Sequence, residues 1–227
     1  MAKYEPIDPT DHVAIPGPHD VSLRPIAEAD LPDLMRWLHE AEVRQFWGTP
    51  EESLDDLRAE YIEPDVYPAW GFVIELDGRG VGLIQYSHRY PDPDYYWDAG
   101  LDILIGEPEA RGRGAGIEAV RVLLRYLLEE KRLHRVTIDP EAGNARAIHV
   151  YERAGFRLDG VLRHNDRVDD RYVDTQYLTI LEDEWPAARA RWVEERGGAV
   201  AAPTLRRLMR ARGRSSARPP FASIRRG

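Results

Sequence analysis

The 227-residue sequence contains no cysteine. Thiolate nucleophiles, cysteine zinc sites and disulfide bonds are therefore excluded. No apolar run approaches the roughly 20 residues that a membrane-spanning helix needs, and the first residues lack the apolar stretch of a signal peptide. We therefore expect a cytoplasmic protein without a membrane partner. The 7 histidines show no metal-ligand spacing, so we expect no metal site.

Charge is distributed very unevenly along the chain. Arginines far outnumber acids in residues 186–227, which carry +9; since the whole chain carries −9, residues 1–185 carry −18. Residues 197–227 lack an apolar pattern, so we expect a basic tail that is disordered or weakly helical. Nucleic acid is a disfavoured partner because Phe221 is the one aromatic residue of this tail. The acidic remainder favours a cationic partner.

A glycine-rich turn lies between an apolar strand pattern and an amphipathic helix pattern. The strand pattern is Leu101 to Ile105, the turn is Arg111 to Gly116, and residues 117–128 carry valine and leucine at helical spacing. Such a turn points backbone N–H groups and the positive end of the helix dipole at a bound phosphate. No Gly-Lys-Ser/Thr follows, which excludes a Walker loop. The spacing of the glycines and residues 107–111, which precede them, disfavour a dinucleotide loop.

A second pattern follows the helix. Residues 135–139 are rich in β-branched side chains and end at Pro140, which predicts a short strand. Asn144 is then a good N-cap, and Gly155 suits a helix stop. The spacing predicts a helix between these two residues.

The remaining patterns complete a mixed α/β sheet. We expect an irregular leader over residues 1–20, a catalytic domain over 21–196 and the basic tail beyond it. Strands are predicted at 21–25, 70–76, 81–87, 99–105, 135–139, 156–162 and 172–181. Helices are predicted at 29–40, 53–61, 117–128 and 144–154.

Both motifs resemble the GCN5-related N-acetyltransferase (GNAT) superfamily. Its acetyl-coenzyme A pyrophosphate loop reads Arg/Gln-x-x-Gly-x-Gly/Ala, and its next helix, beside the pantetheine arm, reads Asn-x-x-Ala-x-x-x-Tyr-x-x-x-Gly-Phe. The resemblance implies the GNAT fold, an α/β fold with a mixed, mostly antiparallel sheet of six to seven strands flanked by about four helices. It also implies acetyl-coenzyme A as cosubstrate. The matching cofactor-binding residues are Leu104, Arg111, Arg113, Gly114, Ala115, Gly116, Asn144 and Tyr151.

Within the superfamily, residues 21–182 resemble aminoglycoside 6′-N-acetyltransferases. The shared segments include Val-Ser-Leu-Arg-Pro, Phe-Trp-Gly, Gly-Leu-Asp and Thr-x-Asp-Pro. The resemblance implies Asp102 and Tyr151 as catalytic residues and a cationic aminoglycoside as the partner. The implied substrate contacts are Trp47, Tyr96, Trp97, Asp98, Asp139, Asp169 and Asp170. Residues 163–170 do not align with these enzymes unambiguously.

The chemistry follows from these implied roles. An alkylammonium with a pKa of about 10 must lose a proton before it attacks a thioester. Asp102 would hold the ammonium and accept that proton, with help from Asp139. A backbone N–H near Leu104 would stabilise the oxyanion, and Tyr151 would protonate the departing thiolate. Without cysteine, transfer should be direct, in a ternary complex.

Several alternatives stay open at this point. Asp102 could be an exposed strand acid, Tyr151 a core aromatic residue, and Asn144 a helix cap alone. A protein N-terminal acetyltransferase shares the cofactor side, and a siderophore hydroxylysine acyltransferase could use His88 or His164. A binding module that senses acyl-coenzyme A without catalysis is the non-enzymatic alternative. The sequence leaves both a monomer and a homodimer open.

Overall fold

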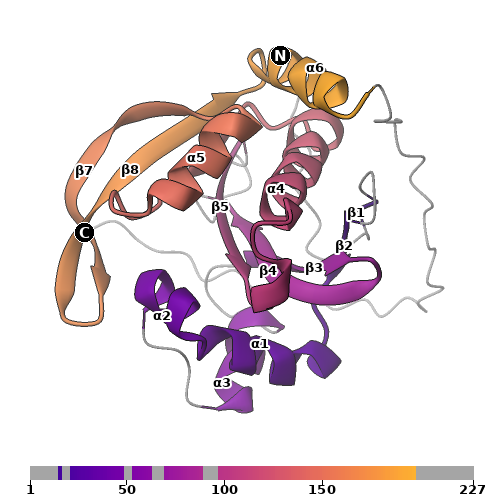
Figure 1. The fold of residues 1–227 in the computed structure, drawn as a ribbon. Helices are drawn as coiled ribbons and strands as arrows, with labels where there is room; N and C mark the ends of the chain where they lie inside the picture. The colour runs from indigo at the N-terminus through magenta and orange to yellow at the C-terminus, as the bar shows by residue number, and fades with distance from the viewer. Residues whose placement is uncertain (1–14, 17–20, 49–52, 63–68, 89–96, 198–227) are drawn as a thin grey trace, which may run out of the picture.

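The computed structural model describes residues 15–16, 21–48, 53–62, 69–88 and 97–197 (Figure 1). Eight strands form one sheet in the order β1-β2-β3-β4-β5-β6-β8-β7, and every neighbouring pair is antiparallel except β5 and β6. The strands are β1 (Ile15–Pro16), β2 (Val21–Pro25), β3 (Ala69–Leu76), β4 (Arg79–Ser87), β5 (Asp98–Ile105), β6 (Arg135–Ile138), β7 (Arg157–Val168) and β8 (Arg171–Leu181).

Helices cover both faces of the sheet. They are α1 (Leu31–Leu38), α2 (Ala41–Trp47), α3 (Leu54–Tyr61), α4 (Ala115–Arg125), α5 (Ala145–Ala154) and α6 (Trp185–Glu195). One apolar core joins α1, α2 and α3 to one face of the sheet, and a second core joins α4, α5 and α6 to the other (Figure 1). The helix of α4 continues as a π-helical turn over Tyr126–Glu130.

The predicted sheet is confirmed as mixed and mostly antiparallel, and each predicted strand is present. Three elements go beyond the prediction. The two-residue β1 lies in the segment that was expected to be irregular. Helix α2 begins without a side-chain cap, and α6 has a proline in its first turn and only a weak apolar stripe. Their sequences therefore carry little local helix signal.

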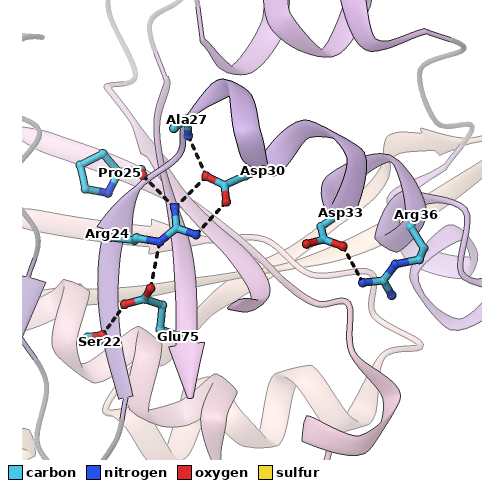
Figure 2. A network of polar contacts seen from close by, with 8 residues as sticks. All are labelled: Ser22, Arg24, Pro25, Ala27, Asp30, Asp33, Arg36 and Glu75. Carbon is cyan, nitrogen blue, oxygen red and sulfur yellow. Dashed lines mark hydrogen bonds and ion pairs between the residues drawn. The ribbon is translucent and has the colours of Figure 1, made fainter. Parts of the chain in front are cut away.

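The chain turn between β2 and α1 is fixed by a network of ion pairs (Figure 2). Arg24 on β2 donates to both carboxylate oxygens of Asp30 at 2.7 Å and to Glu75 on β3 at 2.9 Å. Asp30 also accepts the N–H of Ala27 at 2.9 Å. This network holds the start of α1 against the sheet.

The sheet splits between β5 and β6. The two strands pair in parallel only from Asp98 to Gly100 on β5. Beyond Gly100, β5 keeps its β4 partner as far as Ile105, while β6 continues on β8 alone. This split opens the middle of the sheet between its two helical layers.

The side chains at the split face in alternating directions. Leu104 packs in the core of α1, α2 and α3, whereas Leu101 packs in the core of α4 and α5. Asp102 therefore shares the face of Leu104. By the same alternation, Val136 and Ile138 face α4, so Asp139 faces the same side as Asp102.

Candidate functional site

A cavity of about 640 Å³ lies beside the split. Its walls come from α2, the end of β5, the glycine-rich turn and one side of α5. The lining residues include Glu42, Phe46, Trp47, Ile103, Leu104, Arg111, Gly114, Ala115, Gly116, Asn144, Arg146, His149, Tyr151 and Arg153. Most of the residues predicted to bind the cofactor thus surround one space.

The glycine-rich turn has the backbone that phosphate binding requires. Gly112 and Gly114 have left-handed φ angles of 74° and 87°, which side-chain-bearing residues rarely adopt. Gly114 is the N-cap residue of α4, so the first N–H groups of this eleven-residue helix point at the cavity wall. No heavy atom lies within 4 Å of the place where a Cβ of Gly114 would stand. The residues present therefore fit an anionic phosphate group.

Arg111 lines the cavity and also holds the start of the glycine-rich turn in place. Its guanidinium donates to the carbonyl oxygens of Ile105 at 3.0 Å and Gly106 at 3.1 Å, and it pairs with Glu42 at 2.7 Å. These three partners take up three of the five N–H donors of a largely buried cation. Arg111 thus braces the turn from inside, although its side chain lines the cavity.

The predicted contact of Arg113 with the cofactor stays a prediction. Arg113 does not line the cavity; its half-exposed side chain lies 3.6 Å from Asp77, in the turn between β3 and β4. Three basic side chains of α5 line the cavity instead, and the sequence reasoning missed them. They are Arg146, His149 and Arg153.

The segment between β5 and the glycine-rich turn is anchored to α1. Glu107 accepts from Trp37 Nε1 at 3.1 Å and forms an ion pair with Arg36, which lowers the pKa of Glu107. Gly106 passes so close to the indole of Trp37 that a Cβ would lie 1.9 Å from it. The turn therefore starts from a fixed point.

Backbone groups of successive β5 residues point to opposite edges of the strand. The N–H of Gly106 donates to β4 at 2.9 Å, whereas the carbonyl of Trp97 accepts an N–H at 2.8 Å on the β6 side. Leu104 therefore directs its N–H toward β4. Its carbonyl oxygen points the same way, because a Cβ on Gly82 of β4 would lie 2.2 Å from this oxygen. By alternation, Ile103 rather than Leu104 turns its N–H toward the split.

Asp102 lies on β5 next to the residues that line the cavity. Gln85, directly opposite on β4, donates to Asp102 Oδ2 at 3.2 Å. Asp102 is exposed at the surface, but the protein around its carboxylate removes much of the water, and this desolvation raises the pKa of Asp102. The negative charge of Asp166 raises this pKa further, whereas the hydrogen bond from Gln85 lowers it. Neither Gln85 nor its role could be identified from the sequence.

Asp139 and Asp166 complete a group of three carboxylates with Asp102. Burial raises the pKa of Asp139, and the negative charges of Asp102 and Asp166 raise it further. Asp139 accepts from Asn165 at 3.4 Å. Asn165 and Asp166 lie where the β7–β8 pairing shifts register, beside a left-handed residue at 164. Among the described residues, none of the three carboxylates forms an ion pair.

Tyr151 reaches this group from the opposite helical layer. It comes from α5, lines the cavity and packs edge-on against Phe156, with ring centroids 6.2 Å apart. Burial raises its pKa, and the charges of Asp102 and Asp139 add to the shift, so the phenol stays protonated at neutral pH. Asn144 lines the same cavity while its side chain caps α5 by accepting from Ala147 N–H at 3.1 Å.

Of the other predicted substrate contacts, one lines the cavity and two lie at the junction of β5 with β6. Trp47 lines the cavity from α2. Asp98 is buried at the start of β5 and pairs with Arg135 at 2.8 Å, and Arg135 in turn lies over the ring of Trp97. Asp98 and Trp97 thus belong to the junction of β5 with β6, and their contact with the acceptor stays a prediction.

The hairpin turn between β7 and β8 carries two more predicted contacts. Asp170 is fully exposed there and pairs with Arg167 at 3.0 Å, and Asp169 adopts a left-handed φ of 51° beside it. Because Val168 pairs with Arg171, Asp169 and Asp170 form the turn itself. Asp166, earlier on β7, lies near Asp102 instead. Tyr96 lies outside the described residues.

The two histidines that a siderophore acyltransferase could have used lie outside the cavity lining. His88 is buried, and this burial lowers its pKa; its Nδ1 lies 2.7 Å from the carbonyl oxygen of Asp98. His164 stacks on Tyr172 of the β7–β8 hairpin, with centroids 6.0 Å apart.

No helix among the described residues is long and apolar enough to cross a membrane.

A phosphate-binding turn, a split sheet and an acidic group beside a protonated tyrosine are the features of an enzyme that transfers an acyl group from coenzyme A to an amine. The family model described as Acetyltransferase (GNAT) domain matches residues 27–163, and the chain belongs to this family. The predicted family and fold class are thereby confirmed.

Relatives of known activity share much of the chain. An aminoglycoside N(6′)-acetyltransferase type 1 from Klebsiella pneumoniae is 29% identical over 160 residues, covering 64% of this chain and 78% of the relative. A spermidine N(1)-acetyltransferase from Escherichia coli K12 is 27% identical over 182 residues, covering 76% and 92%. A crystal structure of an aminoglycoside acetyltransferase with coenzyme A and kanamycin is 25% identical, covers 74% of this chain and 99% of that one, and has a TM-score of 0.64.

The cosubstrate follows from the family and from these structures. The protein is a GNAT N-acetyltransferase that uses acetyl-coenzyme A. This confirms the cofactor predicted from the sequence. The acceptor differs between the two relatives, one of which is named for an aminoglycoside and the other for a polyamine.

Proposed function

We propose that the protein transfers the acetyl group of acetyl-coenzyme A to a primary amine of an aminoglycoside, at the 6′ position. The observation that carries the proposal is the group of Asp102, Asp139 and Asp166. Three neighbouring carboxylates that lack ion pairs within the described chain, two of them with a pKa raised by burial and by the charge of their neighbours, suit a ligand with several ammonium groups. Trp47 adds a flat apolar wall for a sugar ring.

Asp102 has the properties of the proton acceptor. It holds the ammonium by charge, and its raised pKa brings its basicity closer to that of an amine. Asp166 supplies the negative charge that favours the uptake of a proton by Asp102, and Asp139 offers a second carboxylate to the cation. Because Asp102 and Asp139 face the same side of the split, the amine would enter from the face that α1, α2 and α3 cover.

Acetyl-coenzyme A supplies the thioester carbonyl and the thiol leaving group. On the protein side, the turn at Gly114 and the start of α4 hold the pyrophosphate, and α5 offers Arg146 and His149 to the other phosphate oxygens. The N–H of Ile103 donates to the carbonyl oxygen as it gains charge. The ammonium would lose one proton to Asp102 before it attacks, and Tyr151 would give its phenolic proton to the departing sulfur. The second amine proton, lost as the amide forms, would return to the Tyr151 oxygen through water.

A polyamine is the second candidate acceptor. The spermidine acetyltransferase covers more of the chain than the aminoglycoside enzyme does, and the acidic group suits both cations. The aromatic side chains Phe46 and Trp47 in the cavity wall favour a ring over a flexible chain. A peptide N-terminus is the third candidate, and it offers a single ammonium to the three carboxylates.

A turnover panel tests the proposal. Purified protein is given acetyl-coenzyme A with kanamycin, spermidine or an N-terminal peptide, and the release of free thiol is followed. We expect the highest kcat/KM with kanamycin, and a kcat/KM lower by about a hundredfold or more for Asp102→Asn with any acceptor. A kcat/KM for spermidine or peptide that exceeds the kanamycin value tenfold would overturn the aminoglycoside assignment.

A further inference from the structure

Helix α2 forms part of the cavity wall and has little stability of its own. It is seven residues long, begins without a side-chain cap and ends at Gly48, whose φ is 92°. Isolated helices shorter than about 12 residues are marginal in water. Val43 anchors α2 in the core of α1 and α3, and Trp47 packs against this core while it lines the cavity together with Phe46. The position of this aromatic wall depends on what else holds α2.

One ion pair joins α2 to the glycine-rich turn within the described chain. Glu42 Oε2 lies 2.7 Å from Nη1 of Arg111, the first residue of the turn. The Arg111 side chain is 12% exposed and also donates to the backbone at the end of β5, whereas the Glu42 side chain is 66% exposed. The cation is thus fixed on the cofactor side, and the carboxylate belongs to the acceptor side.

We infer that Glu42 is a positioning residue that couples the aromatic wall of the acceptor site to cofactor binding. Coenzyme A bound at the turn that Arg111 begins adds to the contacts that already hold Arg111 and Glu42 together, and Glu42 in turn restrains Phe46 and Trp47. The acceptor then binds to aromatic side chains that are already ordered, so it loses less conformational entropy on binding. The two ligands therefore bind with positive coupling. By linkage, the acceptor strengthens coenzyme A binding by the same factor.

The size of the coupling follows from the exposure of Glu42. Ion pairs with an exposed partner are weak, so we expect a factor near the lower end of the usual range, about fivefold. Glu42 also places a negative charge in the cavity that receives an anionic cosubstrate. Its removal should therefore leave coenzyme A affinity unchanged or slightly higher.

Hydrogen exchange tests this inference without an acceptor. The amides of residues 41–47 are followed with and without coenzyme A in wild type, in Glu42→Ala and in Glu40→Ala. Glu40 carries the same charge two residues earlier, and its side chain caps nothing. We expect coenzyme A to slow exchange in wild type and in Glu40→Ala, and to lose this effect in Glu42→Ala. Undiminished slowing in Glu42→Ala would overturn the inference, because direct contact with the ligand would then explain it.

Calorimetry supplies the second measurement. Acceptor affinity is measured with and without coenzyme A, using whichever amine the turnover panel identifies, so failure of the aminoglycoside assignment leaves this test intact. Coupling of about fivefold in wild type and in Glu40→Ala, with none in Glu42→Ala, supports the inference. Equal coupling in all three proteins, or none in wild type, overturns it. A general loss of melting temperature and coenzyme A affinity in Glu42→Ala assigns a structural role instead and also overturns it.

Discussion

The side-chain amide of Gln85 donates a hydrogen bond of 3.2 Å to Oδ2 of Asp102 from the position directly opposite on β4. This contact favours the ionised carboxylate, against the desolvation and the charge of Asp166 that raise the pKa of Asp102. Gln85 therefore keeps the proposed base deprotonated at lower pH than its surroundings alone would allow.

Removing this hydrogen bond should shift the pH dependence of catalysis. In Gln85→Leu, the pKa of Asp102 rises further, so the acidic limb of kcat/KM moves to higher pH. Gln176→Leu on β8 serves as the matched control and should leave the limb in place. The measurement is a pH profile of kcat/KM for the amine. A limb that stays unmoved in Gln85→Leu would remove Asp102 from the role of base.

Asp102→Asn should lower activity and raise stability together. Loss of a positioned proton acceptor that also binds the cation should cost about a hundredfold or more in kcat/KM, while coenzyme A affinity is retained. Because folding raises the pKa of Asp102, its ionised form opposes folding above that pKa. The melting temperature of the variant should exceed that of wild type near pH 8.

The difference in melting temperature should shrink as the pH falls toward about 4, the ordinary pKa of an aspartate, where wild type is also neutral at this position. Asp55→Asn, on the exposed surface of α3, should change neither activity nor melting temperature. Thermal denaturation across this pH range checks both statements. A variant that is less stable than wild type near pH 8 would contradict the account of this carboxylate.

Gly114→Val should abolish coenzyme A binding. Valine is strained at a φ of 87°, and its side chain would enter the space that the pyrophosphate needs. Gly160→Val on β7 adds the same side chain at a position with open space and no left-handed backbone, and should bind normally. Calorimetry with coenzyme A distinguishes them, and equal affinities would refute the assigned pyrophosphate loop.

Deleting residues 198–227 should leave turnover and melting temperature unchanged, because their composition offers little apolar surface to bury. Deleting α6 as well should prevent folding. Trp192 is fully buried and donates to Glu118 at 2.9 Å, and Arg196 pairs with Glu118 at 2.7 Å. Without these partners, Glu118 would lose two of its contacts. Melting temperature and kcat of the two truncated proteins test this boundary. A large drop of either value on deletion of residues 198–227 alone would show that the tail packs on the domain.

The sequence predicted the elements that carry strong local patterns. Val21 to Pro25 forms the predicted strand, Gly114 takes the left-handed turn, and Asn144 caps α5. The position of Asp102 also followed from the sequence, because alternation along β5 places it on the face of Leu104. The spacing of apolar residues and the residue types in turns are local properties, so they can be read from one sequence.

The contacts of the site were less predictable because they join distant segments. Gln85 reaches Asp102 through strand register, and Asn165 reaches Asp139 through a register shift in β7, neither of which the residue pattern specifies. Asp98 looked like a free acid, but the parallel start of β6 brings Arg135 to it.

The most direct test of the central claim is the product that the protein forms from kanamycin and acetyl-coenzyme A. Mass spectrometry measures how many acetyl groups are added, and NMR locates them. The account predicts one acetyl group on the 6′ nitrogen, in a reaction that Asp102→Asn slows by about a hundredfold or more. Unmodified kanamycin, under conditions in which the same preparation fully acetylates spermidine or a peptide, would contradict it.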